Sequence, residues 1–123
     1  MPVNRSAEHH RDRVVEALKE EIGAILEGEL ADPRIGLCTV SEVLLAPGGK
    51  AARVLIQVLG DEKEGEECIA GLSAARAYIR AEVRNRLGKR HVPELTFHLD
   101  RSEQVQSRID ELLGRVKKRT RKT

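Results

Sequence analysis

Three arginines recur at a regular spacing in the second half of the chain. Arg76, Arg80 and Arg84 are four residues apart, in a segment whose apolar residues also recur at helical spacing. Residues four apart lie on the same face of a helix, so three guanidinium groups would share one face. Their forked donors suit the oxygens of phosphate or carboxylate groups. Because Glu82 is the only acid in residues 68–91, the pattern predicts a surface that binds a polyanion.

Further basic residues could extend this surface. The candidate RNA-binding residues on the folded part of the chain are Arg76, Arg80, Arg84, Arg86, Lys89 and Arg90, and those near its end are Arg115, Lys117, Lys118 and Arg119. Residues 115–123 include six basic residues and no acid, a composition that cannot form a core of its own. Local roles stay open: Arg86 and Arg90 could pair with Glu82 or Glu94, Arg34 could pair with Asp32 or cap the preceding helix, and the end of the chain could serve only solubility.

Charge is distributed unevenly along the sequence. Residues 1–67 carry 8 Lys/Arg and 14 Asp/Glu, whereas residues 68–123 carry 14 and 6, within a total formal charge of +2. Such segregation is typical of nucleic-acid-binding proteins, which meet a polyanion with one face. The alternative is that the two halves interleave in space. With one Tyr, one Phe and no Trp, stacking on bases has little support.

Catalytic and metal-binding patterns find little support in the sequence. His9 and His10 are adjacent, so on a helix they would point about 100° apart and could not form a metal-binding pair. Cys38 and Cys68 stand alone without a C-x-x-C partner, which favours buried free thiols over a disulfide or a zinc site. No phosphate-binding P-loop or nucleophile elbow occurs. We therefore expect no enzyme, no catalytic residue, no metal and no cofactor.

The elements that must position the arginines follow the order α-β-β-α-β-α. The patterns predict helices at 6–32, 61–88 and 102–116, and strands at 37–45, 51–59 and 94–100. The first two strands should form an antiparallel hairpin through the turn 46–50, and the third should lie parallel to its neighbour after a helical crossover. The expected fold is α+β, with a three-stranded mixed sheet and the helices packed on one face.

Length and hydropathy bound the organisation of the chain. At 123 residues the chain suggests one domain with a core of ordinary size. The longest apolar run is far too short to span a bilayer, and the first residues lack a signal-peptide pattern. We expect a cytoplasmic protein without membrane association.

Several short motifs, in a fixed order, resemble one known family. They are Leu30-Ala31-Asp32-Pro33-Arg34-Ile35-Gly36, Thr39-Val40-Ser41, Val58-Leu59-Gly60-Asp61, Tyr78-Ile79-Arg80 and, above all, Arg90-His91-Val92-Pro93-Glu94-Leu95-Thr96-Phe97. Each motif alone is weakly specific, but their order and spacing over residues 11–116 resemble the bacterial ribosome-binding factor A family.

This resemblance implies a fold and a function. It implies a type II KH-like rRNA-binding domain at residues 1–116, followed by a flexible basic tail at 117–123. The implied function is that of a ribosome biogenesis factor, which binds the 30S subunit and 16S rRNA in late maturation and supports processing of the 16S rRNA 5′ end and growth in the cold. An assembly GTPase is an implied partner, and we expect a monomer.

Two departures from related patterns affect the binding site. KH domains grip single-stranded RNA with a G-x-x-G loop, and this sequence contains no G-x-x-G. The family instead resembles an interrupted version with an Ala-x-Gly kink between two helices, which matches Ala75-Arg76-Ala77 here, with alanine in place of glycine.

The rival hypotheses are a protein-interaction module that docks a basic partner on its acidic first helix, and a generic KH adaptor for messenger RNA.

Overall fold

The structure, a computed structural model, describes residues 5–28, 30, 32–88 and 91–100, with the side chains of residues 5–8 excepted. The helix predicted at 102–116 and the tail predicted at 117–123 lie outside this part of the chain. Six elements follow one another as α1 (Arg5–Gly28), β1 (Cys38–Leu45), β2 (Ala51–Val58), α2 (Glu62–Ala74), α3 (Arg76–Leu87) and β3 (Glu94–Leu99).

The long helix α1 buries one apolar stripe. Leu18, Ile22 and Ile25 are almost completely buried, at the i, i+4 and i+7 spacing of a helix face. Two details differ from the sequence prediction. The helix has the bounds Arg5–Gly28, so Ser6 lies inside it rather than capping it, and it stops short of Asp32-Pro33.

The strands form the predicted mixed sheet in the order β1-β2-β3. β1 and β2 are antiparallel, and β2 and β3 are parallel. The hairpin turn needs glycine, because Gly48 and Gly49 have φ angles of +85° and +72°, values that side chains with a Cβ rarely adopt. The third strand is tied at both ends, where the Glu94 amide donates to the Lys50 carbonyl and the Asp100 amide to the Ile56 carbonyl. The predicted topology is confirmed.

The predicted helix at 61–88 is two helices. Asp61 caps α2, its carboxylate accepting the Glu64 amide at 2.7 Å, and Gly88 ends α3 in the left-handed conformation. The break falls at Ala75, with φ −90° and ψ 6°. This φ is negative, so the break needs no glycine, and alanine stands there without strain.

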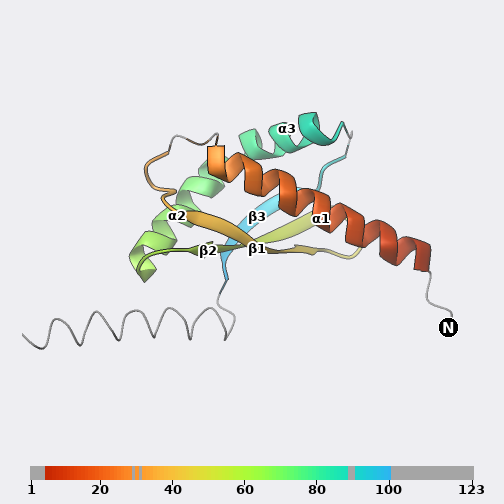
Figure 1. Ribbon diagram of the computed structural model, residues 1–123, viewed down its shortest axis with the longest axis horizontal. Coiled ribbons are helices and arrows are strands. Elements are labelled where there is room, and N and C mark those ends of the chain that lie inside the picture. Colours follow the sequence, from red (N-terminus) through yellow and green to blue (C-terminus); the bar gives the residue numbers. More distant parts are fainter. Residues whose placement is uncertain (1–4, 29, 31, 89–90, 101–123) are drawn as a thin grey trace, which may run out of the picture.

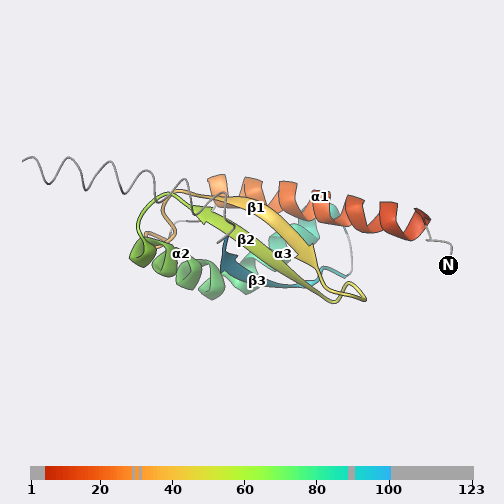
Figure 2. The same cartoon turned by 90° about the horizontal axis from the view of Figure 1, so that it is seen from below.

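The three helices of the described residues cover one face of the sheet. Figure 1 shows α1 crossing the strands and α3 turning away from the axis of α2, and Figure 2 shows the strands in front of α1 and α3. Between the two layers lie the buried side chains, including Val54, Ile56, Leu72, Ile79, Val83 and Leu95. None of the helices in the described ranges is long and apolar enough to cross a membrane.

Candidate nucleic-acid interface

Helix α3 presents its arginines along one edge of its buried stripe. Ile79 and Val83 are fully buried and hold the helix against the core. Arg76 and Arg84 are exposed, and in the described part of the chain no acidic side chain lies within ion-pair distance of either. The C-terminal end of α3 is the negative end of its dipole, which favours a cation at Arg84. These two guanidinium groups are therefore available to an external anion.

Arg80 has a different role from its two neighbours. Its side chain is half-buried, and its Nε and Nη2 atoms donate to the Val92 carbonyl oxygen at 3.1 and 2.7 Å. Val92 is itself buried, 3% exposed. Two charged donors on one buried carbonyl fix the segment that leads into β3 to the side of α3. Arg80 thus positions the chain next to the helix face that carries Arg76, Arg80 and Arg84, the arginine face. Two of the donors of Arg80 are used inside the protein.

Arg86 lies on the opposite side of α3. Arg84 and Arg86 are two residues apart, about 200° around the helix, so they cannot contact the same surface. The Arg86 guanidinium lies 3.6 Å from the Glu21 carboxylate of α1 and 4.0 Å from Glu82. The local pairing with Glu82 that the sequence left open is present, and a second pairing with α1 was not foreseen. The two halves of the chain interleave here, and Arg86 is separated from Arg84.

A loop packs closely against α2 near the break between α2 and α3. A Cβ at Gly71 would lie 2.9 Å from Cγ1 of Ile35 and 3.3 Å from Cβ of Arg34. The loop therefore approaches α2 at a place where only glycine fits. Ile35 is buried in this contact, 4% exposed. Gly71 lies one helical turn before the break at Ala75. Of the two residues predicted for the kink, Ala75 is at the break and Ala77 lies in the first turn of α3.

The same loop is closed by an ion pair. The Asp32 carboxylate accepts hydrogen bonds from the Arg34 backbone amide at 2.9 Å and from its guanidinium at 2.6 to 3.1 Å. These hydrogen bonds lower the pKa of Asp32 and raise the pKa of Arg34. Of the alternatives open for Arg34, the pairing with Asp32 is confirmed. The D-P-R motif thus shapes the loop that packs on Gly71.

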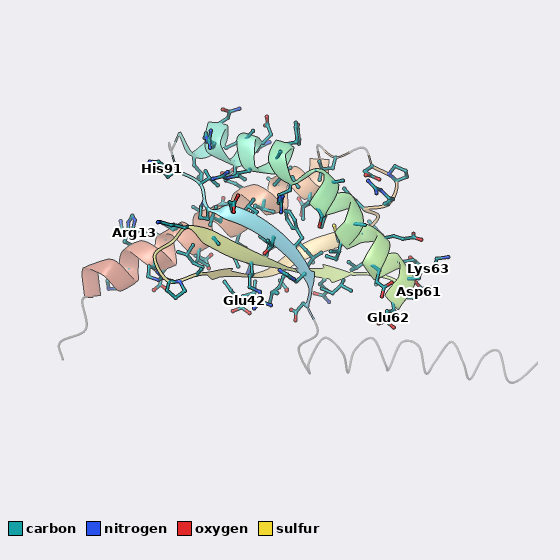
Figure 3. All side chains as sticks on the ribbon, turned by 180° about the vertical axis from the view of Figure 1, so that it is seen from behind. Arg13, Glu42, Asp61, Glu62, Lys63 and His91 are labelled. Carbon is teal, nitrogen blue, oxygen red and sulfur yellow. The ribbon has the colours of Figure 1, made fainter. Side chains whose placement is uncertain are left out.

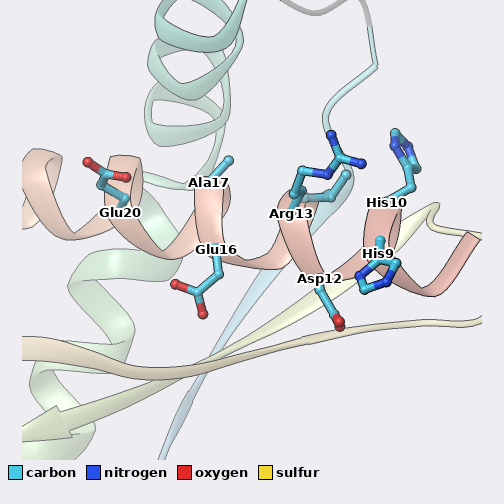
Figure 4. A pocket seen from close by; sticks show the side chains of 8 residues that line it. His9, His10, Asp12, Arg13, Glu16, Ala17 and Glu20 are labelled. Carbon is cyan, nitrogen blue, oxygen red and sulfur yellow. The ribbon is translucent and has the colours of Figure 1, made fainter. Parts of the chain in front are cut away.

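Sequence reasoning missed one exposed cation of α1, Arg13. Figure 3 places Arg13 of α1 and His91, just before β3, at the same end of the molecule. Both residues are exposed. In Figure 4, Arg13 and His10 point to one side of α1, and Asp12 and Glu16 point to the other. The signal was hidden because Arg13 lies in the acidic half of the sequence.

Acidic residues gather at the other end of the molecule. Asp61 and Glu62, at the start of α2, lie far from Arg13 and His91 along the long axis in Figure 3. Carboxylates there favour the positive end of the α2 dipole. The segregation of charge predicted from the sequence is therefore partly reproduced in space, with Arg13 and the Arg86–Glu21 pair as exceptions.

The remaining predicted site residues lie outside the described part of the chain. Lys89 and Arg90 fall between the described ranges, and Arg115, Lys117, Lys118 and Arg119 lie beyond residue 100. They stay predictions.

Neither a metal site nor a disulfide occurs in the described residues. No group of three His, Cys, Asp or Glu side chains there could hold a metal ion. Cys38 and Cys68 are free thiols. Cys68 is buried, as predicted, whereas Cys38 is only half-buried.

Comparison with known proteins extends the resemblance found in the sequence. The family model described as ribosome-binding factor A matches residues 10–113. The ribosome-binding factor A of Koribacter versatilis is 58% identical over 115 residues, 94% of each chain. The crystal structure of ribosome-binding factor A from Thermus thermophilus matches with a TM-score of 0.64 and 27% identity, over 74% of this chain and 97% of that one.

A second match concerns a relative in a 30S complex. Coordinates of a homology model of the Thermus thermophilus ribosome binding factor A, as fitted into the cryo-EM map of a 30S complex of that factor, match with a TM-score of 0.57 and 32% identity, covering 77% of this chain and 96% of that one. The family model spans far more than half of the sequence, and its match agrees with the fold described above. The chain belongs to the ribosome-binding factor A family.

Proposed function

We propose that this protein binds the 30S ribosomal subunit through 16S rRNA during late maturation of the subunit, and that it supports processing of the 16S rRNA 5′ end. The observation that carries this proposal is the pair of exposed arginines on α3, in a chain whose family includes a factor fitted into a map of a 30S complex. The family is one of ribosome-binding factors.

The chemistry of α3 favours phosphate as the group contacted. Arginine donates two parallel hydrogen bonds to phosphate oxygens and remains charged at any physiological pH. Arg76 and Arg84 would donate directly, and Arg80 would hold the adjacent segment in place. Arg13 would add positive charge at the end of the molecule where His91 lies. Lys89, Arg90 and the basic residues from 115 to 119 would extend the contact.

The mode of recognition would be shape and backbone rather than base stacking. Folded rRNA presents dense phosphate charge on a fixed surface, which a rigid basic face can match without reading bases. The sequence lacks G-x-x-G and has one Tyr, one Phe and no Trp, so the usual KH grip on single-stranded bases has no counterpart. This argues against the messenger-RNA adaptor.

Other parts of the proposal rest on the family alone. We extend to this protein an assembly GTPase as the partner in its release, a role in growth in the cold, a monomeric state and a cytoplasmic location. No catalytic role is proposed for any residue.

A charge reversal tests the proposal. Arg76→Glu combined with Arg84→Glu should abolish co-sedimentation with free 30S subunits while circular dichroism and the melting temperature stay unchanged, because both side chains are exposed. The matched control is Glu16→Lys combined with Glu20→Lys on α1, where both residues are exposed. Under the rival protein-interaction hypothesis the control variant would lose its partner and the arginine variant would keep it.

A further inference from the structure

Two leucines form an exposed apolar pair at one end of the sheet. Leu37 and Leu59 are 72% and 66% exposed. The Leu59 amide donates to the Leu37 carbonyl oxygen at 3.1 Å, so the two residues extend the ladder of β1 and β2 by one pair. Side chains of directly opposed residues lie within contact of each other. Two large apolar side chains that are this exposed and side by side favour contact with another apolar surface.

The pair lies on the face of the sheet that the described helices leave uncovered. Its neighbours in the ladder, Cys38 and Val58, pair with each other and pack against the core. Successive side chains of a strand point to opposite faces, so Leu37 and Leu59 point away from the helices. Leu55, four residues before Leu59, is half-buried on the same face. This face therefore carries apolar side chains without a helix of the described residues over them.

The chain leaves the sheet beside this pair. The Asp100 amide donates to the Ile56 carbonyl oxygen at 2.8 Å. Because β3 runs parallel to β2, the chain leaves β3 in the direction of Leu59. With adjacent strands about 4.8 Å apart and a rise of about 3.3 Å per residue, Asp100 and Leu59 lie less than about 10 Å apart. The residues that follow Asp100 in the sequence therefore start next to the leucine pair.

These following residues have the pattern that an uncovered apolar face needs. The sequence predicts a helix at 102–116, with one apolar stripe at helical spacing formed by Val105, Ile109, Leu112, Leu113 and Val116. Most of the stability of such a helix comes from packing its apolar face on another surface. A helix over this range would be about 22 Å long, close to the length of about 26 Å for the eight residues of β2. Length and pattern both match the uncovered face.

We propose that residues 102–116 pack as a helix on the uncovered face of the sheet, with Val105 and Ile109 on Leu37 and Leu59. The segment begins next to the leucine pair, so its first apolar residues are the ones that reach the pair. The rest of the stripe then runs back along β2. This inference uses no residue of the arginine face, and it does not rest on the proposed function.

The packing would also direct the basic residues that follow the helix. β3 begins at the hairpin end of the sheet, where the Glu94 amide donates to the Lys50 carbonyl oxygen. Figure 3 places Arg13 at the end where β3 begins and Asp61 at the opposite end. A helix that starts near Asp61 and runs back along β2 carries residues 115–123, with their six basic side chains, toward Arg13 and away from the acidic end.

Nuclear Overhauser effects in the full-length chain test the packing directly. With isotope-labelled methyl groups on leucine, isoleucine and valine, we expect cross-peaks between the methyl groups of Leu37 or Leu59 and those of Val105 or Ile109. The proposal is overturned if the two leucines show no contact with residues 102–116, or if that segment contacts the helices instead. Contacts that appear only between two chains, in a sample that mixes labelled and unlabelled protein, would also overturn it.

A double-mutant cycle in the full-length chain tests the same contact through stability. Leu59→Ser and Ile109→Ser should each raise the equilibrium constant of unfolding about tenfold, because each removes apolar area from one contact. Together they should raise it much less than about a hundredfold, because they share that contact.

The matched control combines Leu59→Ser with Ser107→Ala, on the polar side of the predicted helix, and the effects of these two changes should multiply. If Ile109→Ser had no effect, or if its effect multiplied with that of Leu59→Ser, the contact would be refuted. The cross-peaks of the wild type decide the question even where a variant fails to fold.

Discussion

Helix α3 carries arginines on two flanks, and the arginines of the two flanks have different roles. On one flank Arg76 and Arg84 face solvent, and on the other Arg86 is held between Glu21 of α1 and Glu82 of its own helix. The buried stripe of Ile79 and Val83 separates the two flanks. The difference shows that a count of charges along a helix does not identify a binding surface. The role of each guanidinium depends on the element that packs next to it.

The largest effect is expected when Arg80 is replaced, because this side chain lies between the flank of Arg76 and Arg84 and the protein core. In Arg80→Ala the buried Val92 carbonyl loses both of its charged donors, which should lower the free energy of unfolding by about 1–3 kcal/mol. Urea denaturation would measure the loss. Arg80→Lys is the control, since lysine can restore one donor and should recover part of the stability. Equal stability of Arg80→Ala and the wild type would show that the hydrogen bonds to Val92 contribute nothing.

Truncating one arginine on each flank compares the flanks directly. Arg84→Ala should weaken binding to 30S subunits about tenfold, equivalent to about 1.4 kcal/mol, and leave the melting temperature unchanged. Arg86→Ala should leave binding unchanged and lower the free energy of unfolding by less than about 1 kcal/mol, because surface ion pairs contribute little. Filter binding and thermal denaturation of both variants would measure the two quantities. If Arg86→Ala weakened binding as much as Arg84→Ala, the two flanks would not differ.

A pair of glycine substitutions tests the close contact between the loop and α2. Gly71→Ala should lower the free energy of unfolding by about 1 kcal/mol, since a Cβ there would approach Ile35 to 2.9 Å and force a shift in packing. Gly23→Ala is the matched control within α1, where nothing lies within 4 Å of the added atom. It should raise stability by about 1 kcal/mol, the gain in helix propensity. The same sign in both variants would show that the loop tolerates a side chain at Gly71.

The smallest effect is expected at Asp32, through pH. Hydrogen bonds from Arg34 lower the folded-state pKa of this carboxyl below its ordinary value of 3.8. The stability that it contributes is therefore present above that value and is lost as the pH falls through the folded-state pKa. Asp32→Asn should lose this contribution at neutral pH, so its melting temperature should lie slightly below that of the wild type there, and the difference should vanish as the pH falls below about 4. An unaltered acid limb in the variant would contradict the role of this pair.

Much of the fold could be predicted from the sequence because its signals are local. Turn glycines at 48 and 49, the Asp61 cap and the Gly88 terminus each act over a few residues, and the parallel pairing of β3 follows from the handedness of crossover connections. The break within 61–88 was located only through the family resemblance. It falls at Ala75, a good helix former, so propensity alone would have continued the helix.

The site was harder to predict, because contacts between residues far apart in the sequence determine what its side chains do. Spacing placed Arg76, Arg80 and Arg84 on one face, which the structure supports, but it could not show that Arg80 reaches a carbonyl twelve residues later or that Arg86 meets Glu21. Arg13 was overlooked because the charge of the whole first half is negative.

The salt dependence of 30S binding, measured for the wild type and for Arg76→Gln combined with Arg84→Gln, tests the central claim most directly. Each phosphate contact contributes about −0.7 to −0.9 to the slope of log K against log salt concentration. If these two arginines contact rRNA phosphates, the slope of the double variant should be shallower than that of the wild type by about 1.4 to 1.8. Equal slopes would contradict the claim that the flank of α3 with Arg76 and Arg84 contacts the RNA backbone.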